Sequence, residues 1–139
     1  MPTPADVKKA LLSAGFEVFR TRGDVVHVAE RARENLIMDS GVRVHAAGTV
    51  GFVVRAQRSD FPGDAEDGMF DRARRLGSAA LDRGYRETGQ NVTRVPDPSD
   101  AQRTLDTWWE VSFEKAVSSL EEAVDEVRFA LSLEKAASR

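Results

Sequence analysis

Residues 42–57 constrain the fold more than any other part of the sequence, because apolar and polar side chains alternate there over two adjoining segments. The apolar members of the pattern are Val42, Val44, Ala46, Val50, Phe52, Val54 and Ala56. A period of two is typical of half-buried strands, and Gly48 between the segments indicates a turn. Since short turns join antiparallel neighbours, the sequence predicts a β-hairpin and with it an antiparallel sheet.

Other segments supply the helices and strands around this hairpin. Helices are predicted where apolar residues recur every three or four positions, over residues 4–14, 69–87 and 116–136. Short strands are predicted over residues 16–22, 91–95 and 104–114. The stretch PDPSDAQR, residues 96–103, is predicted to be a loop, because it holds two prolines and no periodicity.

Residues 24–40 fit two different structures. As a helix, they place five apolar residues on one face, namely Val25, Val28, Ala29, Ala32 and Leu36. As a strand, they place Glu30 and Glu34 on the same face as Val26 and Val28. The helix fits better, with Asp24 as its N-cap, and a strand is the alternative.

Together these elements predict one α+β domain over residues 1–139, with an antiparallel sheet of four to five strands flanked by helices. The expected order is α-β-α-β-β-α-β-β-α, ending in a long C-terminal helix. This order is similar to that of the small α+β chaperones of secretion systems and of roadblock-type adaptors. No residue motif accompanies the similarity, and a fold does not fix a function.

The charge distribution argues against nucleic acid as a partner. The net charge is −3, and ten acidic residues face only three basic ones between Asp97 and Glu134. DNA-binding domains usually present a strongly basic surface. No apolar run approaches the length of about 20 residues that a membrane span needs, so we expect no membrane partner. We expect a bacterial, cytoplasmic protein, because arginine outnumbers lysine 16 to 4, as GC-rich coding favours, and cysteine is absent.

Catalytic and metal-binding motifs are weak throughout the sequence. The two histidines, His27 and His45, lie in no metal-ligand spacing, and no serine is set in a nucleophile elbow. The acidic residues of the loop at 59–68 are better explained by the helix that follows, whose N-terminus favours negative charge. We therefore expect no catalytic residue, no metal and no cofactor.

The adjacent Trp108 and Trp109 carry the strongest indication of a functional surface. In a strand, neighbouring side chains point to opposite faces, so one sheet face cannot bury both. Trp109 shares its face with apolar residues and is predicted to enter the core. Trp108 lies between Asp106 and Glu110 and is predicted to lie on the other face.

Polar residues of the hairpin have the parity that would place them near Trp108. These are Arg43, His45 and Arg55, and either arginine would stack on the indole. Three arrangements remain open for Trp108: it is covered by its own chain, it binds a partner protein, or it lines a small-ligand pocket with Arg55, His45 and Glu110.

Phe129 and Leu133 form a second candidate surface. They are four residues apart in the C-terminal helix and lie off its main apolar stripe, so they are neighbours on the helix surface. Either intrachain packing or a subunit interface would explain them. The sequence thus favours a non-enzymatic protein-interaction module, an adaptor or chaperone-like homodimer, over a small-ligand sensor or enzyme.

Overall fold

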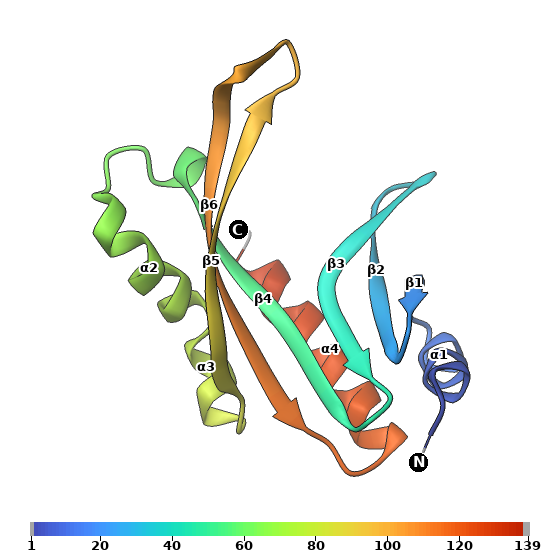
Figure 1. The fold of residues 1–139 in the computed structure, drawn as a ribbon. Coiled ribbons are helices and arrows are strands. Elements are labelled where there is room, and N and C mark those ends of the chain that lie inside the picture. The colour runs from blue at the N-terminus through green and yellow to red at the C-terminus, as the bar shows by residue number, and fades with distance from the viewer. Residues whose placement is uncertain (1, 138–139) are drawn as a thin grey trace. The chain divides into compact units, whose positions relative to one another are not determined.

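The computed structural model describes residues 2–137, without the side chains of residues 32 and 134–137. Its helices are α1 (Pro4–Ser13), α2 (Met69–Leu76), α3 (Ser78–Asp82) and α4 (Leu120–Ala137). Its strands are β1 (Val18–Arg22), β2 (Val25–Arg33), β3 (Leu36–His45), β4 (Thr49–Gln57), β5 (Arg86–Asp97) and β6 (Asp100–Ala116) (Figure 1). Two short 3₁₀ turns, Arg58–Asp60 and Glu66–Gly68, lie between β4 and α2.

The strands form one sheet in the order β1-β2-β3-β4-β6-β5. The three pairs from β1 to β4 are antiparallel, and β3 and β4 form the predicted hairpin, with His45 opposite Thr49. The predicted α+β class, antiparallel sheet and long C-terminal helix are therefore confirmed. The expected count of four to five strands was wrong, because the described chain has six.

The extra strand comes from residues 24–40, for which the prediction of a helix was wrong. These residues form β2 and the first part of β3, joined by a tight turn at residues 34–35. The pairing of β2 with β3 shifts register between His27 and Ala29. Ser40 lies at this irregularity, where its buried hydroxyl donates to the Val28 carbonyl oxygen at 2.7 Å and accepts from the Val42 N–H at 3.1 Å. The side chain thereby replaces ladder hydrogen bonds that the shift removes.

The described chain forms two compact units. The first contains the residues up to Phe52 and from Glu114 onward, and the second is Val53–Phe113. Strands β4 and β6 contribute residues to both units. The organisation of the chain as a single domain stays a prediction.

In the first unit, α1 and α4 pack on the sheet and on each other. The strand residues of the core are Val26, Val28, Val42, Val44, Val50 and Phe52, all 0–1% exposed. The helices add Val7 and Leu11 from α1 and Ala123, Val127 and Ala130 from α4. Figure 1 shows α4 running along the side of β3.

Local chemistry fixes where these two helices begin. Thr3 and Asp6 form a capping box at the start of α1, followed by Pro4 at the first helical position. The hydroxyl of Ser119 accepts from the Glu122 N–H at 3.1 Å, which marks Ser119 as the N-cap of α4. This cap explains why α4 begins at Leu120, four residues after the predicted start at residue 116.

In the second unit, α2 and α3 pack on the β6 face that carries Trp109, Val111 and Phe113, all buried. Gly77 separates the two helices, where one helix was predicted over residues 69–87. A Cβ atom on Gly77 would lie 2.7 Å from Cε2 of Phe113, so only glycine fits there without a shift of the buried ring.

The predicted loop at residues 96–103 was also wrong. Strand β5 continues to Asp97, and β6 begins at Asp100, so only residues 98–99 form the turn. Pro96 lies near the end of β5, which is the outermost strand of the sheet, and edge strands tolerate proline.

Candidate functional site

The strand parity predicted for the two tryptophans is confirmed. Trp109 is 5% exposed and lies on the face covered by α2 and α3, whereas Trp108 is half-buried on the opposite face. Arg55 of β4 shares that opposite face, because its neighbour Val54 lies beside Gly77 in the helix-covered core. The two side chains thus meet on the face turned away from α2 and α3.

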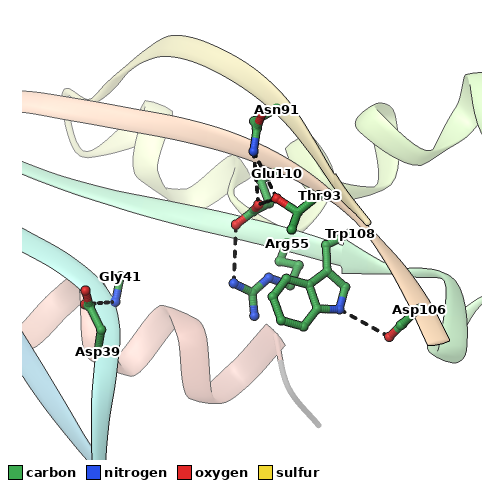
Figure 2. A network of polar contacts seen from close by, with 8 residues as sticks. All are labelled: Asp39, Gly41, Arg55, Asn91, Thr93, Asp106, Trp108 and Glu110. Carbon is green, nitrogen blue, oxygen red and sulfur yellow. Dashed lines mark hydrogen bonds and ion pairs between the residues drawn. The ribbon is translucent and has the colours of Figure 1, made fainter. Parts of the chain in front are cut away.

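Arg55 covers one side of the Trp108 ring. Its guanidinium carbon lies 3.7 Å from the ring centroid, and an Nη atom lies 3.3 Å from a carboxylate oxygen of Glu110. The arginine therefore makes a cation–π contact and an ion pair at once, and the carboxylate helps to hold the guanidinium over the indole (Figure 2).

Glu110 connects β5 to Arg55 through the hydrogen bonds of its carboxylate. Its second carboxylate oxygen accepts from the Thr93 hydroxyl at 2.6 Å and from the Asn91 amide at 3.4 Å, as Figure 2 shows. The side chain of Glu110 is only 15% exposed. Both oxygens are thus engaged within the protein, which leaves the carboxylate poorly suited to act as a general base.

Asp106 fixes the other end of Trp108. The indole Nε1–H donates to a carboxylate oxygen of Asp106 at 3.2 Å, and Ser59 donates to the same residue through its N–H at 3.1 Å and its hydroxyl at 2.9 Å. Burial alone would raise the pKa of Asp106. The hydrogen bonds from Ser59, Thr107 and Trp108 outweigh that effect and hold the pKa below its ordinary value.

We call the set of Ser59, Arg55, Asn91, Thr93, Asp106, Trp108 and Glu110 the Trp108 network. Its members come from β4, β5, β6 and the turn after β4, and its charged side chains are paired within the set. The result is a half-exposed aromatic ring held by its own chain in one orientation. Within the described residues, no group of three or more histidine, aspartate or glutamate side chains is arranged to hold a metal ion.

Arg43 and His45 belong to the first unit, whereas Trp108, Arg55 and Glu110 belong to the second. The Arg43 guanidinium lies over Gly51 and 3.9 Å from the Glu114 carboxylate. His45 ends β3, and its Nε2 atom is buried without a hydrogen-bond partner among the described residues. Of the two arginines proposed to stack on Trp108, Arg55 is the one that does.

The structure places Phe129 inside the first unit. Its ring packs edge-on against Phe52 of β4, with centroids 6.5 Å apart and an interplanar angle of 77°. Leu133 is half-buried on the same helix. Intrachain packing, one of the two explanations left open by the sequence, is therefore the explanation for Phe129.

Sequence reasoning did not select four members of the Trp108 network: Ser59, Asn91, Thr93 and Asp106. Asp106 was recognisable in principle, because it lies two residues before Trp108 and so shares its face. The other three depend on strand register, which the sequence does not specify.

The sequence matches no protein-family model, and no curated protein or solved structure is significantly similar to it. None of the helices described here combines the length and apolar character that crossing a bilayer requires.

Proposed function

We propose that this protein is a non-enzymatic protein-interaction module that binds a partner protein through the Trp108 network. The observation that carries the proposal is the position of Trp108, half-buried on the face turned away from α2 and α3 and held by Arg55 and Asp106. Complete burial of a large aromatic side chain releases more free energy than burial of most other side chains. A complex in which the partner covers the exposed part of Trp108 is therefore stabilised.

The chemistry of the network supports a protein as the occupant. Tryptophan and arginine are the residues most enriched at the energetic centres of protein interfaces. Trp108 and Arg55 already hold one orientation. Their side chains would therefore lose little conformational entropy when a partner binds. The polar rim of Asn91 and Thr93 would suit a partner surface that adds hydrogen bonds around an apolar centre.

A small-ligand sensor or enzyme has less support. Arg55 already occupies one side of the Trp108 ring, and the oxygens of Glu110 are engaged by Arg55, Thr93 and Asn91. A ligand would have to displace these contacts. The homodimer and the bacterial cytoplasm expected from the sequence remain part of the proposal, with a second copy as one candidate partner for this face.

Site-specific photocrosslinking in cells tests the proposal. A photoreactive residue is placed at Gln57, which lies two residues from Arg55 on the same face of β4, and the matched control is placed at the exposed Ala79 of α3. We expect one defined protein adduct from position 57, its loss in Trp108→Ala, and no such adduct from position 79. An adduct that persists without Trp108, or that forms equally from position 79, would contradict the proposal.

A further inference from the structure

The β2–β3 hairpin ends in three consecutive exposed aliphatic side chains. Leu36, Ile37 and Met38 are 47%, 39% and 52% exposed, and we call them the apolar tip. Strand side chains alternate between faces, so the tip is apolar on both sides of the hairpin. Pairing of β1 with β2 stops at Val28, and the tip therefore extends beyond the neighbouring strand.

Acidic residues outnumber basic ones next to the apolar tip, where Glu30, Glu34 and Asp39 accompany Arg31 and Arg33. Two nitrogens of Arg31 donate to the two carboxylate oxygens of Glu17 at 2.9 Å each, and a third donates to the Glu34 carbonyl. Arg33 is exposed, but the acidic residues outnumber the two arginines, so this end of the hairpin offers no net positive charge to lipid headgroups or nucleic-acid phosphates. Its exposed chemistry is that of aliphatic side chains, which bind best to an apolar surface of matching size.

An apolar pocket lies in the first unit, which also contains the apolar tip, and we call it the end pocket. Its volume is about 240 Å³, and its walls come from α1, the β3–β4 turn and the start of α4. The apolar lining residues are Pro2, Val7, Val44, Ala46, Ala47, Gly48, Val117, Leu120 and Ala123. The hydroxyls of Ser118 and Ser119, which also line it, are engaged with Glu122 at the start of α4.

The size of the end pocket favours a side chain over a larger ligand. Small-molecule sites usually enclose about 300–1,000 Å³. At about 240 Å³, the end pocket is below this range and suits one or two aliphatic side chains.

The apolar tip cannot fill the end pocket of its own chain. Leu36 begins β3 and His45, which lines the pocket, ends it. Nine residue steps of a strand span about 30 Å. The two features therefore lie at opposite ends of one strand.

We propose that the apolar tip of one copy inserts into the end pocket of a second copy. The first unit carries both the apolar tip and an apolar pocket of matching size, and the length of β3 keeps them apart within one copy. A second copy can therefore supply the side chains that fill the pocket. We propose that each pair of copies makes this contact once, head-to-tail, so each added copy leaves one tip and one pocket open. Repetition gives a ring if the rotation closes and a filament if it does not.

Sedimentation velocity over a range of protein concentrations tests the contact. The wild type should form species larger than a dimer. The tip variant Ile37→Asp and the pocket variant Ala47→Trp should each weaken association about tenfold or more, because a buried aliphatic contact is lost. Both positions lie where solvent reaches them, so circular dichroism should show an unchanged fold. Leu12→Asp and Ala79→Trp, at exposed positions outside the tip and the pocket, are the matched controls and should associate like the wild type.

Mixing the two variants separates a head-to-tail contact from a symmetric one. Ile37→Asp retains its pocket and Ala47→Trp retains its tip, so an equal mixture should form a dimer that does not grow further. An interface that pairs one surface with the same surface of a second copy would give no such rescue, and a reciprocal exchange of tips would stop the wild type at a dimer. A wild type that stays monomeric up to about 1 mM, where even weak contacts are populated, would overturn the proposal.

Binding of an apolar dye such as anilinonaphthalene sulfonate by a strictly monomeric wild type, with its loss in Ala47→Trp, would instead identify a small-molecule pocket and likewise overturn it. The variant Trp108→Ala should keep the tip-to-pocket contact that Ile37→Asp and Ala47→Trp weaken, and should lose only the adduct at position 57, so this contact and the proposed function fail independently.

Discussion

The guanidinium of Arg55 lies 3.7 Å from the centroid of the Trp108 ring, and the two residues come from β4 and β6. The contact decides which part of Trp108 is left for a partner. One side of the ring is covered by its own chain, and its Nε1–H is taken by Asp106. The exposed remainder is therefore apolar ring surface held in a fixed orientation.

A double-mutant cycle measures the strength of this contact. We expect Arg55→Ala and Trp108→Ala to be coupled by about 0.5–2 kcal/mol in the free energy of unfolding, because the cation–π contact is partly desolvated. Urea denaturation of the wild type, both single variants and the double variant gives the coupling. Arg72→Ala combined with Phe61→Ala is the matched comparison, because that guanidinium lies 4.3 Å from the Phe61 ring. Additive effects at Arg55 and Trp108 would show that the stacking contributes no stability.

Truncation of the two neighbouring tryptophans should cost very different amounts of stability. Trp109→Ala should cost about 3–5 kcal/mol of stability, because it leaves a large cavity in a core where the ring is 5% exposed. Trp108→Ala should cost only about 1–2 kcal/mol, because its ring is half-buried. Thermal and urea unfolding of both variants provide the comparison. Equal losses would mean that Trp108 is as important to the fold as Trp109 and would weaken its assignment to a binding surface.

Gly77→Ala should destabilise the protein although alanine is the better helix former. The added Cβ would lie 2.7 Å from Cε2 of Phe113 and 3.2 Å from Cγ2 of Val54, and the Phe113 ring is 1% exposed and cannot move aside freely. Overpacking of this kind costs about 1–3 kcal/mol. The variant Gly63→Ala, whose Cβ would meet no atom within 4 Å, is the control and should change stability little. Phe113→Leu should recover part of the loss in the Gly77→Ala background, as measured by the midpoint of urea unfolding.

Stability should decline as the pH falls just below the ordinary pKa of histidine, about 6.5, partly because of His27. Burial lowers the pKa of His27. Asp39 opposes this effect, while Arg20, Arg43 and Arg22 add to it. In the window between the lowered folded-state pKa and 6.5, the unfolded chain binds more protons, so acidification favours unfolding there.

His27→Gln should flatten the pH dependence of the free energy of unfolding in that window, as measured by urea denaturation. An unchanged slope in the variant would show that His27 makes no contribution.

Residues 24–40 show why a sequence pattern can suggest the wrong element. The pairing of β2 with β3 shifts register between His27 and Ala29 and again between Arg31 and Arg33. A bulge breaks the strict alternation of a strand, so Val28 and Ala29 are both buried although they are adjacent. Apolar residues at positions 25, 28, 29 and 36 then imitate the spacing of a helix. In contrast, the regular hairpin of β3 and β4 was predictable because nothing interrupts its alternation.

The candidate site was predictable only within one strand. Parity along β6 correctly separated Trp108 from Trp109, because that rule depends on the local backbone alone. The partners of Trp108 come from β4, β5 and the turn after β4, and their approach depends on how those strands are paired. Arg55 was named as one of two candidates. Thr93 and Asn91 were not, because residues 96–103 were taken for a loop rather than for the ends of a continuous hairpin.

The hydrogen bonds of Ser40 make the β2–β3 turn a position where the chain should tolerate insertions. The buried hydroxyl of Ser40 binds the backbone of both β2 and β3 and so fixes their pairing between the core and the hairpin turn. Residues inserted at positions 34–35 would lie on the turn side of Ser40. The hydrogen bonds of Ser40 would prevent β2 and β3 from changing register to accommodate them. An epitope tag placed there should therefore be displayed at the turn while the valines of β2 and β3 keep their partners, and the same position is where length differences between natural variants of this chain should accumulate.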